Sequence, residues 1–268
     1  MRGQDLRRTD AHPRPFVMGI LNATPDSFSD GGRYIDVDAA VEHAFAMIDA
    51  GAEIIDIGAE STRPGFSPVP AEEEIARLIP VIERLSQSSD AIISADTMKT
   101  ETARAAVSAG ADIINDVNAL RWPGMMDLIA ESGVPAVIMH MTGSPEDTHS
   151  MTVEGPVVDG VRDFLNERIS AAEDLGISRD MLVIDPGIGF GKTMEQNEEL
   201  LRNLDGIGID LPMLVGVSRK RLLAGMYPGM DADEATVKAS LIAAEKCADI
   251  LRVHDVRRMA EALQNMNL

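Results

Sequence analysis

Cysteine is almost missing from this sequence, which has one in 268 residues, so no disulfide can form within the chain. We expect that residue, Cys247, to be a buried structural thiol. No group of cysteines and histidines has the spacing of a zinc site. Long hydrophobic runs are also lacking, because none approaches the roughly 18 residues of a membrane span. Residues 1–15 have no apolar segment of the kind found in a secretory signal. These absences predict a cytoplasmic protein that does not enter a membrane.

Positive charge is scarce as well. Lysines and arginines number 24 against 44 aspartates and glutamates, which gives a formal net charge of -20. Nucleic acids and anionic membranes attract basic surfaces, so this balance disfavours both as partners. Most of the positive charge is arginine, because lysine occurs only at Lys99, Lys192, Lys220, Lys238 and Lys246. An anionic substrate must therefore be bound by a local cationic cluster.

The sequence does contain many hydrophobic residues, 45% of the chain, and they include eight short apolar runs. Such runs are typical of parallel strands that are buried on both faces. The runs are Phe16 to Leu21, Glu53 to Ile57, Ala91 to Ala95, Asp112 to Ile114, Ala136 to Met139, Met181 to Ile184, Met213 to Val217 and Asp249 to Leu251. Between them lie helical patterns with apolar residues every three or four positions, and helix starts are expected at Asp38, Thr100 and Asp233.

This alternation of strand and helix continues without a linker. We therefore predict a single α/β domain, a (β/α)₈ TIM barrel, over residues 16–268, after a flexible N-terminal tail at residues 1–15. A weak repeat supports the barrel: AGAEIIDI from Ala50, AGADIIND from Ala109 and KCADILRV from Lys246. Gly51 and Gly110 in this repeat fit left-handed helix C-caps. A doubly wound open sheet is the main alternative.

Most of the predicted strands end at a residue that can bind or ionise. These residues are Asn22, Asp56, Asp96, Asn115, His140, Asp185, Ser218 and Arg252. A (β/α)₈ barrel carries its active site at the carboxyl ends of its strands. Three connections on that face, residues 23–36, 59–70 and 141–155, are long enough to be lids or binding loops.

Asp96, Asn115 and Asp185 follow neighbouring strands of the predicted barrel. Two carboxylates and an amide make a hydrogen-bonding cradle suited to a flat heterocycle rich in N–H groups. Each residue alone could instead cap a helix, but three together favour the cradle.

The first two long loops each carry a residue of interest. In NATPDSFSDGG, Asn22 offers a neutral oxygen ligand for Mg²⁺, and Phe28 is either the apolar tip of a closing flap or part of a turn-rich surface loop. In ESTRPGFSPVP, the prolines stiffen the loop around Arg63. Arg63 is equally consistent with an anion contact and with a solvated surface arginine.

The segment DPGIGFGKT from Asp185 resembles a nucleotide P-loop, but Pro186 stands where that motif requires glycine. Its three glycines instead let the backbone approach a ligand, with Phe190 as an apolar wall. Lys220, Arg252 and His254 follow the seventh and eighth strands, where this fold binds phosphate groups. The alternative is that they form surface ion pairs.

Other candidates favour packing over chemistry. His140 has no partner at ligand spacing, so we interpret it as a satisfied core histidine. Trp122, Met125 and Met126 are expected to pack, and Met139 either packs or lines the pocket.

The motifs MGILNATPDSFSDGG, DIGAESTRPG, DPGIGFGK, SRK and RVHD, with Asp96 and Asn115 between them, resemble the dihydropteroate synthase family over residues 16–264. The resemblance implies a barrel, usually a homodimer, that is a target of sulfonamides. Such an enzyme joins 6-hydroxymethyl-7,8-dihydropterin diphosphate to 4-aminobenzoate in folate biosynthesis, with Mg²⁺, and releases diphosphate.

The resemblance also implies roles for individual residues. It places the chemistry at Asp96, Lys220, Arg63 and Phe28. The pterin would contact Asp96, Asn115, Met139, Asp185, Phe190, Gly216, Lys220 and Arg252. The diphosphate would contact Asn22, Arg63, Arg252 and His254, with Mg²⁺ at Asn22, and the aminobenzoate would contact Phe28, Thr62, Pro64 and Lys220.

Three residues depart from the family pattern: Ala23 replaces a common valine, Ala59 a common glycine and Arg221 a common serine. The first two are small, whereas Arg221 adds bulk and charge beside the predicted aminobenzoate entrance. Two alternative functions remain at this point. One is a pterin-dependent methyltransferase barrel that passes a methyl group to a corrinoid, and the other is a pterin-binding protein without turnover.

Overall fold

The computed structural model describes residues 6–24, 36–60, 69–144 and 151–266. Within them, eight parallel strands form one sheet in the order β6-β5-β4-β3-β2-β1-β8-β7. The strands are β1 Phe16–Asn22, β2 Ile54–Gly58, β3 Ile92–Asp96, β4 Ile113–Asp116, β5 Ala136–Met139, β6 Leu182–Asp185, β7 Leu214–Val215 and β8 Ile250–Val253.

The sheet closes into a barrel, as predicted. β1 pairs with both β2 and β8, so the first and last strands are neighbours. Between β6 and β7 there is a parallel bridge from Ile184 to Met213, and the Ile184 amide donates to the Pro212 carbonyl at 2.9 Å. The open-sheet alternative is therefore wrong.

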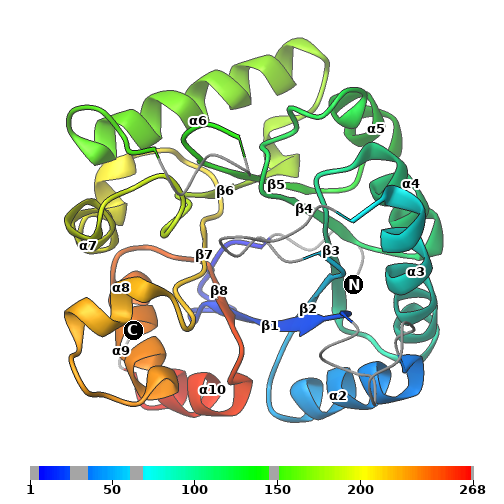
Figure 1. The fold of residues 1–268 in the computed structure, drawn as a ribbon, viewed down its shortest axis with the longest axis horizontal. Coiled ribbons are helices and arrows are strands. Elements are labelled where there is room, and N and C mark those ends of the chain that lie inside the picture. Colours follow the sequence, from blue (N-terminus) through cyan, green and yellow to red (C-terminus); the bar gives the residue numbers. More distant parts are fainter. Residues whose placement is uncertain (1–5, 25–35, 61–68, 145–150, 267–268) are drawn as a thin grey trace.

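Helices surround the strands as an outer ring (Figure 1). They are α2 Val37–Asp49, α3 Ala71–Ser88, α4 Thr100–Ala109, α5 Met125–Ser132, α6 Val157–Asp174, α7 Met194–Arg202, α8 Arg221–Met226, α9 Ala232–Glu245 and α10 Val256–Gln264, with 3₁₀ turns η1 Arg179–Met181 and η2 Leu204–Ile207. Thr100 begins α4 as predicted. The N-caps of α2 and α9 are Asp36 and Asp231, two residues before the expected starts.

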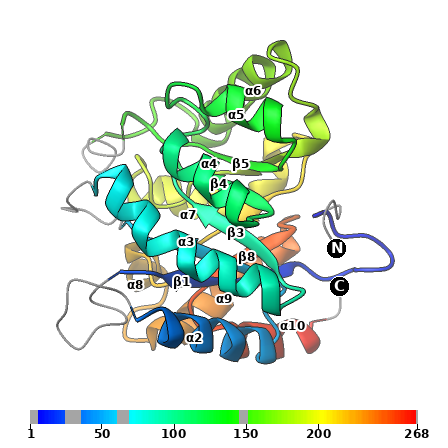
Figure 2. The ribbon, with the colours of Figure 1, turned by 90° about the vertical axis from the view of Figure 1, so that its right-hand side faces the viewer.

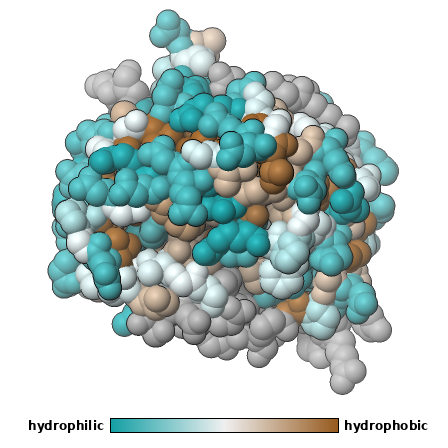
Figure 3. Space-filling model, turned by 90° about the horizontal axis from the view of Figure 1, so that it is seen from above, coloured by the Kyte–Doolittle hydropathy of each residue, from teal (hydrophilic) through white to brown (hydrophobic). Residues whose placement is uncertain are grey.

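Hydrophilic side chains cover most of the face seen in Figure 3, with separate smaller hydrophobic patches. This distribution agrees with the strongly acidic composition. Among the described helices, none combines the length and apolarity needed to cross a membrane.

The strand sequences explain why the barrel has an apolar floor and a polar mouth. Side chains alternate along a strand, so every second residue faces the barrel axis. Near the amino ends, Ile54, Ile92 and Ile113 join one buried hydrophobic cluster with residues of the other strands. Two positions further along the same strands lie Asp56, Ser94 and Asn115. The change from isoleucine to polar residues places the site at the carboxyl end.

Residues 6–15 differ from the loosely held tail expected from the sequence. They lie at the amino end of the barrel (Figure 2). Leu6 is 5% exposed and belongs to the hydrophobic cluster of the barrel floor. The Arg8 amide donates to Asp249 at 2.9 Å, and the ring of His12 stacks on Phe16 with centroids 4.1 Å apart. This segment therefore covers the floor.

Two packing predictions are wrong. Cys247 is exposed, because it occupies the turn position that Gly51 and Gly110 occupy in the other repeats. All three residues have positive φ, 71° at the cysteine and 106° and 107° at the glycines. Trp122, in the connection between β4 and α5, is 38% exposed, whereas Met125 is buried as predicted and Met126 packs against the core.

Candidate active site

A buried polar network spans the barrel mouth. The Arg252 guanidinium donates from Nε to Asp56 Oδ2 at 2.5 Å and from Nη2 to Asp96 Oδ2 at 2.6 Å. Asn115 Nδ2 lies 3.2 Å from both carboxylate oxygens of Asp56. Ser94 Oγ donates to Asp56 Oδ1 at 2.6 Å. The network joins β2, β3, β4 and β8 and brings together three of the predicted pterin contacts.

Asp56 is the functional residue that sequence reasoning missed. It was identified as a strand-end residue but given no role, although its side chain is fully buried and touches three members of the network. A charge inside an otherwise apolar strand, two residues after the floor residue Ile54, is the signal that could have identified it. Its position indicates that it orients Arg252 and Asn115.

Asp185 ends β6 on another side of the mouth. Its Oδ1 accepts a hydrogen bond from the Gly187 amide at 2.7 Å, so the turn after the strand fixes the carboxylate. Lys220 Nζ donates to the Ile188 carbonyl and lies 4.7 Å from the centre of the Phe190 ring. The predicted residues Asp185, Phe190 and Lys220 are therefore gathered by one loop.

An apolar wall completes this part of the site. Met98, Val117, Met139 and Met141 form a buried cluster, and Phe190 packs against it. Met139 is 3% exposed, so the same side chain both packs in this cluster and forms part of the wall. Gly216, another predicted pterin contact, follows β7, and a Cβ there would lie 3.6 Å from the Arg252 Cβ. A flat ring would thus meet hydrocarbon beside the polar network.

Burial shifts the ionisation of the site residues. It raises the pKa of Asp96 to about 7, against the opposing charge of Arg252. It lowers the pKa of Lys220 to about 8, against the opposing effect of Asp185. Burial also lowers the pKa of Arg252, but Asp56 and Asp96 outweigh this effect and the net shift is upward. Titrating groups close to neutrality are typical of reaction centres.

The two histidines of interest have different surroundings. His140 is 4% exposed, its Nδ1 lies 2.8 Å from Lys192 Nζ, and its ring packs edge-on against Phe164. The interpretation as a satisfied core histidine is confirmed. His254 follows β8, and its Nδ1 lies 2.8 Å from the hydroxyl of Ser218, which follows β7. This contact joins the ends of β7 and β8 at the rim where an anion was predicted.

Asn22 is the last residue of β1 and pairs in register with Gly58 of β2. A Cβ at Gly58 would lie 3.4 Å from the Asp96 carboxylate, so Asn22 and Asp96 are separated by one strand. In the described part of the chain, no three His, Cys, Asp or Glu side chains form a metal cluster. A single amide oxygen suits Mg²⁺, which retains waters and takes ligands from phosphates.

The remaining predicted residues lie outside the described residues. They are Phe28, Thr62, Arg63 and Pro64. The described residues next to these segments do belong to the carboxyl end of the barrel. Ala23 follows β1 and its amide donates to the Gly58 carbonyl at 2.7 Å, and Glu60 follows β2.

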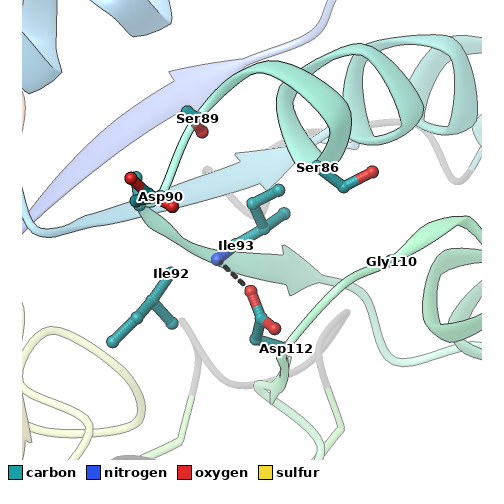
Figure 4. Close-up of a pocket in the computed structure, with 8 residues that line it drawn as sticks. Ser86, Ser89, Asp90, Ile92, Ile93, Gly110 and Asp112 are labelled. Atoms are coloured by element: carbon teal, nitrogen blue, oxygen red, sulfur yellow. Dashed lines mark hydrogen bonds between the residues drawn. The ribbon is translucent and has the colours of Figure 1, made fainter. Parts of the chain in front are cut away.

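A pocket at the amino end of β3 is distinct from this site (Figure 4). It is lined by Ser86, Ser89, Asp90, Ala91, Ile92, Ile93, Gly110 and Asp112. Asp112 Oδ2 accepts a hydrogen bond from the Ile93 amide at 3.0 Å, so one carboxylate oxygen is engaged in joining β3 to the next repeat. With a volume of about 160 Å³, the pocket is smaller than the roughly 300 Å³ at which ligand sites begin.

Comparison with known proteins gives the family of the chain. A family model described as pterin binding enzyme matches residues 18–254. Dihydropteroate synthase from Escherichia coli K12 is 43% identical over 253 residues, which cover 93% of this chain and 90% of that protein. A probable bifunctional folylpolyglutamate synthase/dihydropteroate synthase from Haloferax volcanii is 49% identical over 243 residues, 90% of this chain, but the chain spans 29% of its length.

Solved structures agree with this relationship. Dihydropteroate synthase from Xanthomonas albilineans with 4-aminobenzoic acid has a TM-score of 0.87 and 48% identity, with 94% of this chain and 92% of that chain covered. The same enzyme in complex with 7,8-dihydropteroate has a TM-score of 0.83 and 45% identity at the same coverage. A Yersinia pestis dihydropteroate synthase with a sulfonamide drug complex has a TM-score of 0.88 and 40% identity, covering 94% and 93%. The chain therefore belongs to the pterin binding enzyme family and, within it, to the dihydropteroate synthases.

Proposed function

We propose that this chain condenses 6-hydroxymethyl-7,8-dihydropterin diphosphate with 4-aminobenzoate, giving 7,8-dihydropteroate and diphosphate. It is a transferase of folate biosynthesis. The observation that carries the proposal is the buried network in which Arg252 joins Asp56 and Asp96, with Asn115 beside them. Its relatives include an enzyme solved with 4-aminobenzoic acid and with 7,8-dihydropteroate.

The pterin lies between the polar network and the apolar wall. Asp96 Oδ2 accepts from Arg252, so Oδ1 is the oxygen that accepts a pterin N–H group. Asp185 accepts from the opposite edge of the ring, and Asn115, held by Asp56, contributes its amide. Met139 and Phe190 contact the ring faces. Hydrogen-bonded edges combined with apolar faces fit a flat heterocycle.

The diphosphate lies at the rim formed by β7 and β8. Two of the five Arg252 N–H donors are used by the carboxylates, so three remain for phosphate oxygens. The hydrogen-bonded pair of His254 and Ser218 offers a further donor at the same rim. Asn22 would hold Mg²⁺ together with diphosphate oxygens, and the ion, when bound, neutralises negative charge on the leaving group.

The reaction is dissociative. Cleavage of the bond between the exocyclic carbon and the diphosphate oxygen leaves a cationic methylene group that the electron-rich pterin delocalises. The carboxylate of Asp96 stabilises that cation electrostatically in a buried, low-dielectric site. The amine of 4-aminobenzoate is neutral at pH 7, so its attack needs no strong general base. By the family resemblance, Arg63, Phe28 and Lys220 would also take part in the chemistry, and exclusion of water from the site would protect the cation.

The anion cluster distinguishes this function from the two alternatives. A pterin that donates a methyl group carries no diphosphate, so a methyltransferase would have no use for Arg252, His254 and Ser218 at one rim. A binding protein without turnover would not need a leaving-group site beside the carboxylate that stabilises the cation. As part of the same proposal, the enzyme is a cytoplasmic homodimer.

The test is a turnover assay with both substrates. Purified protein should release diphosphate and form 7,8-dihydropteroate only when 4-aminobenzoate and Mg²⁺ are both present. Titration calorimetry with pterin diphosphate alone runs beside it. Binding of the pterin without product at any substrate concentration would refute the synthase and support the binding protein.

A further inference from the structure

Lys192 lies in the connection between β6 and α7. Its ammonium group has three hydrogen-bond partners, two backbone carbonyl groups and a histidine ring nitrogen. Nζ lies 2.8 Å from the Gly187 carbonyl oxygen, 2.9 Å from the Phe190 carbonyl oxygen and 2.8 Å from His140 Nδ1. An ammonium group has three N–H donors and accepts nothing. The three contacts therefore use all of its hydrogens, and none of the acceptors is a carboxylate.

His140 has the ionisation state that this arrangement requires. Burial lowers its pKa to about 3, and the positive charge of Lys192 adds to that effect. The ring is consequently neutral at pH 7. When Lys192 is protonated it can only donate, so Nδ1 is then the acceptor and the ring proton is on Nε2. His140 therefore acts as the third acceptor for the ammonium group.

The backbone of the loop at residues 187–191 lies tightly against the segment that follows β5. A Cβ at Gly187 would lie 1.8 Å from the His140 carbonyl oxygen, and one at Gly191 would lie 2.5 Å from the Thr142 Cβ. Both glycines have positive φ, 65° and 60°. Buried backbone carbonyl groups need hydrogen-bond partners. Lys192 folds back on two of those carbonyls and closes the loop.

This loop carries a large part of the proposed pterin site. The Gly187 amide orients Asp185, and the Ile188 carbonyl accepts from Lys220. Phe190 supplies its ring to the apolar wall and lies beneath the Lys220 ammonium group. A shift of the loop would move all three groups at once.

We propose that Lys192 is a positioning residue for the pterin site. Its ammonium group, with neutral His140 as the third acceptor, fixes the loop at 187–191 so that Asp185, Phe190 and Lys220 meet the ring together. Lys192 itself does not touch the substrate. This role rests on the proposed function, and it assigns a purpose to a motif lysine that the reaction does not use.

Burial and charged neighbours both act on the ionisation of Lys192. Burial lowers its pKa to about 7, with Asp185 of β6 opposing the shift and Lys220, which precedes α8, adding to it. The other charged group nearby is Arg121, after β4, which acts on His140 after β5. A neutral amine keeps two donors, which still serve the two carbonyl groups, and its lone pair can accept from the other tautomer of His140. Both protonation states of Lys192 therefore hold the loop.

The experiment compares wild type with Lys192→Met, Lys192→Arg and His140→Leu in steady-state assays that vary each substrate separately. For Lys192→Met, kcat/KM for pterin diphosphate should fall on the order of 100-fold, the loss expected from misplacing groups by about 1 Å. The KM for 4-aminobenzoate should change least. Lys192→Arg should recover part of the loss, because its guanidinium can donate to both carbonyls. His140→Leu should lose less, because two of the three contacts remain.

Matched controls separate positioning from general destabilisation. Leu85→Ala removes a buried side chain from α3, and Lys246→Met removes a surface lysine that pairs with Asp205. A kinetic loss in Lys192→Met no larger than in Leu85→Ala at equal loss of Tm would overturn the proposal. If Lys192→Met does not fold, wild-type kinetics in both Lys192→Arg and His140→Leu would overturn it.

The measurements on wild-type protein distinguish this test from the test of the proposed function. Absence of turnover in wild type contradicts the synthase itself. In that event, pterin diphosphate affinity measured by calorimetry in the same variants still decides the role of Lys192. Equal affinities in wild type and Lys192→Met would refute it.

Discussion

Replacing Asp56 by asparagine should weaken both the stability and the activity of the chain. Asp56 accepts hydrogen bonds from Ser94, Asn115 and Arg252, and its side chain is completely buried. Asparagine keeps the shape and one acceptor oxygen, but its NH₂ group must face a donor. It also removes the charge that holds Arg252 Nε at 2.5 Å.

The size of the effect follows from these contacts. Removing one partner of a buried ion pair costs about 3–5 kcal/mol. Arg252 keeps Asp96 as a partner and its side chain is 24% exposed, so we expect the loss of one charged hydrogen bond, about 2 kcal/mol. For a chain of this length that lowers Tm by about 4–8 °C. If the misoriented Arg252 stabilises the transition state less by the same free energy, about 2 kcal/mol, then kcat/KM falls about 30-fold.

Asp233→Asn is the matched control. Asp233 also pairs with an arginine through two short contacts, Arg219 Nε to Oδ1 at 2.7 Å and Nη2 to Oδ2 at 2.9 Å, but on the surface. A surface pair contributes about 0–1 kcal/mol. Differential scanning calorimetry and steady-state kinetics should therefore show a small change in Asp233→Asn and a large one in Asp56→Asn. Equal changes in the two variants would refute a special role for Asp56.

Four further predictions concern the same face of the barrel. Asp96→Asn should lower kcat far more than it weakens pterin diphosphate binding by calorimetry, and equal losses would argue against a cation-stabilising role. Since burial raises the pKa of Asp96 to about 7, kcat/KM should rise between about pH 6 and pH 8 as the carboxylate ionises, and a flat profile would contradict this. Between about pH 4 and pH 7, the folded state keeps the Asp96 proton that the unfolded state has lost. The contribution of Asp96 to stability is therefore present below about pH 4 and is lost as pH rises towards 7. Tm differences between wild type and Asp96→Asn across that range measure it. Lys99→Met should lower the free energy of unfolding by about 3–5 kcal/mol, because Lys99 bridges the buried carboxylates of Glu60 and Glu74, and an unchanged urea midpoint would contradict this.

The sequence predicted the barrel because the alternation of apolar runs and helical patterns is a local signal. The run Ala136 to Met139 coincides with β5, and the other strands shift by a residue or more at their ends. The exception is the seventh run, Met213 to Val217, of which only Leu214–Val215 is a strand. Pro212 lacks an amide hydrogen, and contact with β6 is made through the Met213 bridge, so the ladder is short here.

Much of the site could be predicted for the same reason. The polar residues at strand ends mark the mouth, and Asp96, Asn115 and Arg252 do meet there. What the sequence did not reveal was the pairing across the barrel. Arg252 reaches Asp56 over 196 positions of sequence, and only the closure between β1 and β8 brings them together. Such contacts depend on the register of the strands, and the register cannot be deduced from the residues at the strand ends alone.

Local backbone geometry explains the other misses. Cys247 was predicted to be buried from its residue type, but its environment is set by a turn with φ of 71°. Lys192 received no role because its partners are mainly carbonyl groups of its own loop. A sequence shows which side chains are present, whereas contacts with backbone depend on the fold of the loop.

A crystal structure with bound 6-hydroxymethyl-7,8-dihydropterin diphosphate tests the central claim most directly. We expect the pterin ring in the barrel mouth, with its N–H edges on Asp96 and Asp185, Asn115 beside it and the diphosphate against Arg252 and His254. A ring bound outside the mouth, or one inside it that leaves Asp96 and Asp185 without contact, would contradict the account.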